Sequence, residues 1–93
     1  MDRVKTEWRD RIFDVRQVQV IPGHINVGDL LLQGNDYFEV VTVQKEVPRL
    51  ENLSHRFTMF TLESRDGTIV PLRGDRLQGK QTVLKKTKKV IFV

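Results

Sequence analysis

The chain has no cysteine, no long apolar run, and only three prolines and one tryptophan. Without cysteine it can form no disulfide framework, thiolate metal site or thiol nucleophile. No apolar run approaches the roughly 20 residues that span a bilayer. The N-terminus, MDRVKTEWRD, is too charged for a signal peptide. We therefore expect a soluble, cytoplasmic protein that binds no membrane.

What is present indicates one small globular unit. The chain has 93 residues, of which 39% are hydrophobic and 30% charged. Domains usually contain about 100–150 residues, so we expect residues 1–93 to form a single domain. The hydrophobic share is too high for wholesale disorder, and a chain of this size can bury a small core.

Turn signals recur along the chain and separate short segments rich in β-branched and aromatic residues. The turn signals are Pro22-Gly23, Gly34-Asn35-Asp36, Asp66-Gly67, Gly74-Asp75 and Gly79. Short segments of this composition between frequent turns are typical of β-sandwiches and barrels. We predict an all-β (mainly β) fold, a small SH3-like or OB-like barrel of five to seven short strands.

Two hairpins are indicated most clearly. Residues 25–33 turn into 37–44, and the three consecutive leucines Leu30–Leu32 suit a strand buried on both faces. Residues 56–63 meet 68–73 across a turn, where Pro71 indicates an edge strand. Further strands are expected over 12–21, 81–86 and 89–93, and a loop over 46–55.

The stretch GDLLLQGNDYFEVVTV, residues 28–43, is similar to the first hairpin of small SH3-like barrels in translation and transcription factors. Those hairpins share a Gly-Asp pair before apolar residues, a turn, and an aromatic residue before paired valines. The similarity covers about a sixth of the chain and uses residues that any buried hairpin would use, so it assigns the chain to no family.

The two ends of the chain leave alternatives open. Val4, Trp8, Ile12 and Val15 have helical spacing, which favours one short N-terminal helix over residues 1–11. An arm or a strand is the alternative, because such short helices are marginal. Residues 81–93 are expected to form a basic C-terminal strand or a tail.

The excess positive charge lies at the C-terminus. Residues 1–16 carry a net charge of +1, residues 17–76 carry −2, and residues 77–93 carry +5. A cluster of one sign is expected for a protein that binds a polyanion. Lysines also protect exposed strand edges from pairing, which is the alternative explanation of the same cluster.

Several residues are therefore candidates for contacts with nucleic acid. Basic side chains would bind phosphates, and an exposed aromatic ring would stack on a base. The basic candidates are Arg73, Arg76, Lys80, Lys85, Lys86, Lys88 and Lys89, and the stacking candidates are Tyr37 and Phe57. Because strand residues alternate, Lys85 and Lys86 are expected on opposite faces. We also expect substitution of Lys85, Lys86, Lys88 and Lys89 by glutamine to leave the fold intact.

No constellation indicates catalysis, and we expect no enzyme activity, cofactor or metal. Residues 74–80 match the phosphate-loop spacing G-x-x-x-x-G-K, but Gln81 stands where a magnesium-binding Ser or Thr is needed. His24 and His55, the two histidines, lie in predicted loops. The carboxylates are scattered singly, so no acid–base pair is indicated.

The sequence leaves two functions in competition. The first is a noncatalytic nucleic-acid-binding β-barrel that contacts phosphates through the C-terminal lysines. The second is a structural or protein–protein interaction module, a subunit of a larger assembly or a homo-oligomer. Tyr37 and Phe38 are expected on opposite faces of their strand, so the sheet would present apolar side chains on both faces. In such a module the C-terminal strand would join a partner's sheet.

Overall fold

The computed structural model describes the backbone of residues 3–8 and 11–92, and the side chains of residues 6–8 and 14–86. Within these residues the fold is all-β. The strands are β1 (Arg3–Trp8), β2 (Arg11–Val20), β3 (Leu30–Gln33), β4 (Asp36–Pro48), β5 (Arg56–Glu63), β6 (Ile69–Arg73) and β7 (Gln81–Phe92). Two 3₁₀ turns, η1 (Pro22–His24) and η2 (Gly74–Arg76), lie in connections.

Both predicted hairpins are confirmed. β3 pairs with β4 from Leu30↔Glu39 to Gln33↔Asp36, and β5 pairs with β6 from Met59↔Arg73 to Glu63↔Ile69. Each turn contains a glycine with positive φ, which residues with a Cβ rarely adopt: Gly34 at +62° and Gly67 at +92°. β3 is shorter than expected, since the chain before Leu30 forms η1 and turns.

The favoured helix over residues 1–11 is wrong, and the strand alternative is the one that the structure shows for Arg3–Trp8. Arg3–Trp8 forms β1, which pairs antiparallel with β2 from Arg3↔Arg16 to Trp8↔Arg11. Pairing with the long strand β2 gives this segment a ladder of backbone hydrogen bonds. A short helix on its own is only marginally stable. The helical spacing of the apolar residues was therefore overridden by tertiary contacts.

Of the two alternatives for residues 81–93, strand or tail, the strand is confirmed through Phe92, but the expected division into two strands, 81–86 and 89–93, is wrong. β7 is one strand, and it pairs with β2 at both ends, from Val20↔Gln81 to Arg11↔Phe92. The register shifts between Phe13↔Val90 and Val15↔Lys86, so residues 87–89 of β7 form an irregularity inside one strand. The C-terminal segment is therefore part of the chain's own sheet through Phe92.

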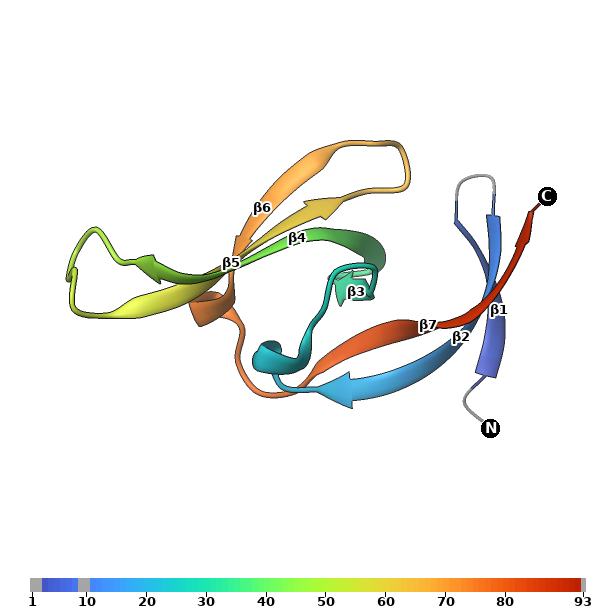
Figure 1. Cartoon of the computed structure of the whole chain (residues 1–93), viewed down its shortest axis with the longest axis horizontal. Helices are drawn as coiled ribbons and strands as arrows, with labels where there is room; N and C mark the ends of the chain where they lie inside the picture. The colour runs from blue at the N-terminus through green and yellow to red at the C-terminus, as the bar shows by residue number, and fades with distance from the viewer. Residues whose placement is uncertain (1–2, 9–10, 93) are drawn as a thin grey trace.

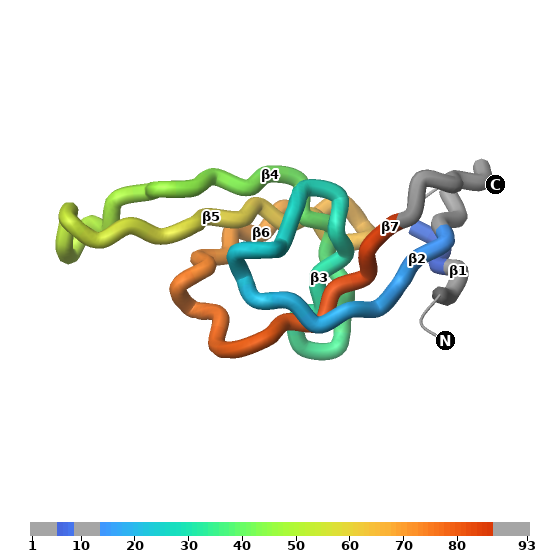
Figure 2. The backbone as a smooth tube through the Cα atoms, turned by 60° about the horizontal axis from the view of Figure 1, so that its bottom comes forward, coloured from blue at the N-terminus to red at the C-terminus, as the bar shows by residue number. Residues whose placement is uncertain are grey.

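The strands form one antiparallel sheet in the order β1-β2-β7-β3-β4-β5-β6. It curls around β3, with β4 and β5 on one side and β2 and β7 on the other (Figures 1 and 2). β1 and β6 are its edges and do not pair with each other, so the sheet is open. Pro71 lies in the edge strand β6, as predicted, where its missing N–H also protects that edge.

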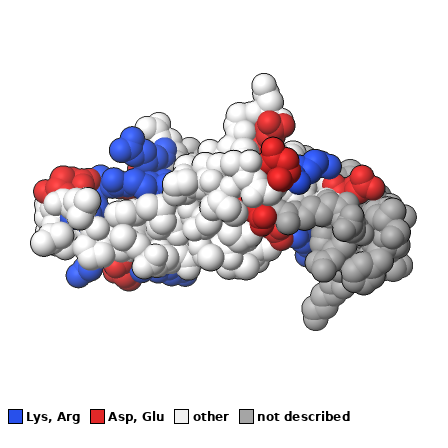
Figure 3. All heavy atoms as spheres, turned by 90° about the horizontal axis from the view of Figure 1, so that it is seen from above, with Lys and Arg blue, Asp and Glu red and all other residues white. Residues whose placement is uncertain are grey.

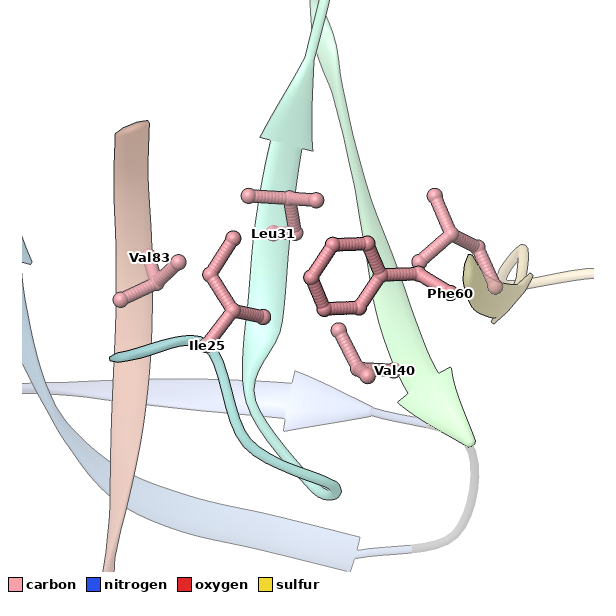
Figure 4. Close-up of a cluster of buried hydrophobic side chains, with 6 residues drawn as sticks. Ile25, Leu31, Val40, Phe60 and Val83 are labelled. Carbon is pink, nitrogen blue, oxygen red and sulfur yellow. The ribbon is translucent and has the colours of Figure 1, made fainter. Parts of the chain in front are cut away.

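The sheet has a core on each face. The first cluster contains Ile25, Leu31, Val40, Phe60, Leu62 and Val83, and the second contains Trp8, Val15, Leu30 and Leu84. Figure 4 shows the side chains of the first cluster converging from several elements around Phe60. Neighbouring residues on β3 and on β7 divide between the two clusters, because strand residues alternate. The prediction that β3 is buried on both faces is confirmed for Leu30 and Leu31, each 0% exposed.

The β4–β5 pair continues beyond the sheet as an arm, residues 45–58. Val47↔Phe57 and Pro48↔Arg56 pair within it, past the point where β6 ends at Met59↔Arg73. Figure 1 shows the arm extending away from the curled part of the sheet. The predicted loop is correspondingly shorter, from 49 to 55, and backbone hydrogen bonds such as Arg49 N–H to His55 O close it.

Candidate nucleic-acid interface

The two lysines that begin the C-terminal basic segment are paired within the fold. Lys85 Nζ lies 2.5 Å from Asp29 Oδ2, and also donates to the backbone oxygen of His24 at 3.1 Å. Lys86 Nζ lies 3.0 Å from Glu39 Oε2. Asp29 is only 6% exposed, so its carboxylate needs a compensating cation. Lys85 and Lys86 therefore act first as structural residues, and they do so on opposite faces, as alternation predicts.

Arg73 and Phe57 contact each other at the base of the arm. The Arg73 guanidinium lies 4.3 Å from the centre of the Phe57 ring and 2.8 Å from Asp75 Oδ2. Glu51 and Arg49 complete this cluster, with Arg49 Nη2 3.1 Å from Asp75 Oδ2. Figure 3 shows acidic and basic side chains side by side on this end of the molecule. The ring of Phe57 is therefore covered by a cation whose charge is already balanced.

The charge cluster shifts the ionisation of its members. Hydrogen bonding to Arg73 lowers the pKa of Asp75 below its ordinary value of 3.8, and the Arg73 pKa is raised in return, chiefly by Asp75. The pKa of Glu51 is lowered mainly by a hydrogen bond to its own backbone N–H. All of these groups remain charged near neutral pH, so the cluster is a permanent feature at pH 7.

Tyr37 lies elsewhere, beside the second cluster. It is half-buried against that cluster and also lines a cavity between the β3–β4 and β5–β6 turns. Phe38, the next residue, packs against the first cluster instead. The predicted separation of these two rings onto opposite faces is confirmed, and the second face is covered by Trp8 from β1.

Arg76 and Lys80 are exposed in the connection from β6 to β7. The phosphate-loop spacing over residues 74–80 forms η2 and a turn, and it leads into β7 rather than into a helix. His24 and His55 are exposed in connections, as expected. Among the residues that the structure describes, no group of three metal-ligating side chains is found, nor any helix long and apolar enough to cross a membrane.

Lys88 and Lys89 fall on the part of β7 that pairs with the N-terminal half of β2, while their side chains lie outside the described residues. There the backbone brings together the two ends of the sequence. β1 and β2 pair Arg3 with Arg16 and Lys5 with Asp14, and Arg11 pairs with Phe92 of β7. We call this three-stranded region the basic end: β1, residues 11–16 of β2 and residues 85–92 of β7.

The formal charge of the whole protein is concentrated in the segments that form the basic end. Residues 1–16 and 85–93 carry nine basic and four acidic side chains, a net charge of +5. Residues 17–84 carry seven basic and eight acidic side chains, a net charge of −1. Two of the nine, Lys85 and Lys86, are paired with carboxylates outside these segments.

The contribution of the N-terminus to this region has no signal in the sequence alone. Residues 1–16 carry only +1 taken alone, and Arg3, Lys5, Arg11 and Arg16 are mixed with acids. Strand pairing between segments about 75 residues apart makes them neighbours of the C-terminal lysines. No local pattern marks this, since long-range register depends on which strands meet.

No protein-family model, curated protein or solved structure matches this chain.

Proposed function

We propose that this protein is a noncatalytic nucleic-acid-binding module, a small β-domain with the curled sheet of SH3-like or OB-like barrels. It would act in the cytoplasm and contact phosphates through the basic end. The observation that carries the proposal is the pairing of β1, β2 and β7, which joins the two segments holding all of the excess positive charge. Neutralising phosphates with Lys and Arg releases counterions, and this drives sequence-independent binding.

The proposal shifts the contact residues from those predicted. Arg73, Lys85 and Lys86 hold carboxylates of the fold, so they have less charge to offer a phosphate. Lys88 and Lys89 stay in the proposed interface. Arg3, Lys5 and Arg11 join them by strand pairing. Arg16 is exposed on β2 at the same end and completes the set.

Two variants with the same formal charge test the proposal. The basic-end variant carries Arg3→Gln, Lys5→Gln, Lys88→Gln and Lys89→Gln. The control variant carries Lys45→Gln, Arg56→Gln, Arg76→Gln and Lys80→Gln, all at exposed positions outside the basic end, so it also tests the two predicted contacts Arg76 and Lys80. Each set of four substitutions lowers the formal net charge from +4 to 0. Any difference between the two then reflects position and not total charge.

Binding to single- and double-stranded oligonucleotides is measured by fluorescence anisotropy over a range of salt concentrations. The basic-end variant should bind all sequences more weakly, and its salt slope should flatten by about one unit for each lost phosphate contact. The control variant should keep most of the parental slope. Equal losses in both variants, or no binding by the parent at low salt, would refute the proposal.

A second candidate function is a protein-interaction module, and the arm is the observation that favours it. At the tip, Leu50 is 93% exposed and Leu53 is 66% exposed. A two-stranded ribbon gains little stability by itself, and exposed apolar residues on it suit a protein partner. The predicted contact through the C-terminal strand stays a proposal beside the arm: β2 occupies one edge of β7 to Phe92, while β3 pairs with the other edge only at Val83 and Leu84 among the described residues.

Chemical cross-linking in the cells that make the protein tests this candidate. Lys45 is exposed at the base of the arm and supplies an amine for the cross-linker. Cross-links from Lys45 to another protein should disappear with Leu50→Ser and Leu53→Ser. They should persist with Val27→Ser, a matched change at a site 62% exposed away from the arm. Cross-links that survive the leucine changes would rule out the tip as the contact.

A further inference from the structure

A cavity of about 580 Å³ lies where the β3–β4 turn meets the β5–β6 turn. Its wall includes Asn35, Asp36, Tyr37, Phe38, Arg65 and Asp66. The volume is in the range of pockets that hold small organic ligands. β4 begins in this cavity and ends in the arm, so the cavity lies at the opposite end of β4 from the arm tip.

The wall combines an aromatic ring with polar residues. Tyr37 and Phe38 both line the cavity, but the Phe38 ring packs against the first cluster, so Tyr37 supplies the ring for stacking. Asn35 and Arg65 are polar residues of the same wall. Asp66 accepts hydrogen bonds from Ser64 and from the backbone N–H and hydroxyl of Thr68, so it shapes the turn. With two carboxylates against one guanidinium, the cavity disfavours an anion. A planar, neutral group with hydrogen-bonding edges fits this chemistry.

The cavity is connected to the basic end by one side chain. Arg65 Nη1 donates to the backbone oxygen of Glu7 on β1 at 3.1 Å. The Arg65 guanidinium also lies 5.0 Å from the centre of the ring of Trp8, the last residue of β1. The strand that carries Arg3 and Lys5 therefore ends against the wall of the cavity. A ligand in the cavity that continued out of it would meet the basic end.

We propose that the cavity binds one unpaired base of a single-stranded nucleic acid whose phosphates follow the basic end. The inference rests on the proposed function and names its preferred substrate. The base stacks on Tyr37, and its edge faces the polar wall, while the phosphates remain outside among the basic residues. A paired base in a duplex cannot enter, so the site distinguishes single strands from double strands.

The same geometry separates the two stacking residues predicted from the sequence. Tyr37 lines the cavity, whereas the Phe57 ring is covered by Arg73 at 4.3 Å. The structure therefore assigns stacking to Tyr37 and a structural contact to Phe57. Tyr37→Leu and Phe57→Leu form a matched pair, since each removes a half-buried ring and leaves an apolar side chain.

The experiment compares two strands of equal length and phosphate charge, one normal and one in which every base is replaced by an abasic sugar. The parent protein should bind the normal strand at least about fivefold more tightly, the lower range for stacking of one base. Tyr37→Leu should reduce that ratio toward one without changing the salt slope. Phe57→Leu should keep it. Tyr37 also packs on the second cluster, so the melting curve of each variant is recorded.

A second readout uses the one tryptophan of the chain. Because Arg65 lies over Trp8, filling the cavity should change Trp8 fluorescence with the normal strand and not with the abasic strand. If the parent binds both strands equally with a steep salt slope, the cavity proposal is wrong and phosphate binding stands. If it binds neither strand at low salt, both proposals are wrong.

Discussion

Lys85 and Lys86 are adjacent in the sequence yet hold carboxylates on opposite faces of the sheet. Lys85 reaches Asp29 beside η1, and Lys86 reaches Glu39 on β4. Successive side chains on a strand point to opposite faces of the sheet, so two neighbouring lysines place one cation on each face. At the residue scale, Lys85 and Lys86 each form a salt bridge from β7: Lys85 to the connection before β3, and Lys86 to β4.

The expectation that these lysines can be replaced without effect is therefore revised for Lys85. Lys85→Gln should lower the free energy of unfolding by about 1–3 kcal/mol, because it leaves the Asp29 carboxylate buried without its cation. Lys80→Gln, at an exposed position, should change it by less than about 0.5 kcal/mol. Urea unfolding of both variants measures the difference. Equal stabilities would show that water or another group compensates Asp29.

Gly74 permits a close approach between η2 and β5. A Cβ at this position would lie 2.9 Å from the backbone oxygen of Thr58 and 3.1 Å from Cε2 of Phe60. Gly74→Ala should therefore destabilise the fold by about 1–3 kcal/mol, the usual range for overpacking. Gly23→Ala is the control, since nothing lies within 4 Å of a Cβ there. Thermal unfolding that ranks the two variants equally would contradict the close packing of η2.

At the scale of elements, the β5–β6 turn and the base of the arm depend on ionised carboxylates. Hydrogen bonds from Ser64 and Thr68 lower the pKa of Asp66, and Arg73 lowers that of Asp75. A carboxyl group whose pKa is lower in the folded state than in the unfolded state stabilises the fold at a pH above its unfolded-state pKa. The contribution is lost as the pH falls through the folded pKa.

Stability should therefore decline as the pH falls below about 3.8, the ordinary pKa of both groups. Asp66 and Asp75 are both exposed residues, although the Asp75 side chain itself is 20% exposed, so solvent screening keeps the effect small. The double variant Asp66→Asn and Asp75→Asn should show a shallower decline than the parent when melting temperature is followed from pH 6 to pH 2. Parallel curves for the two proteins would place the acid sensitivity in other carboxylates.

The whole molecule is elongated because the arm leaves the sheet. The Cα radius of gyration is 14.1 Å and the principal extents are 46 × 28 × 24 Å. A compact domain of this length would have a radius of about 12 Å. Small-angle X-ray scattering of the monomer should therefore give a radius near 14 Å or slightly more, because hydration adds to it. A value near 12 Å would mean that the arm folds back onto the sheet in solution.

Much of the fold could be predicted because its signals are local. The hairpins around Gly34 and Gly67, the edge position of Pro71 and the two-faced burial of Leu30 and Leu31 follow from turn chemistry and alternation. For the N-terminal segment the sequence leaves helix and strand open, because its apolar residues fit helical spacing and only pairing with β2 makes it a strand. Closure of a barrel was expected, but β1 and β6 remain separate edges.

The candidate site divides in the same way. The sequence by itself determined the residue types: an excess of lysine near the C-terminus, aromatic residues on alternating faces, and no catalytic or metal constellation. Only the tertiary structure decided which of them are free to bind. It paired Lys85 and Lys86 with carboxylates, covered Phe57 with Arg73, and set Tyr37 in a cavity. The physical reason is that the residues packed around a side chain decide whether its charge is already balanced and whether its ring is exposed. Strand pairing brings those residues together from distant parts of the chain.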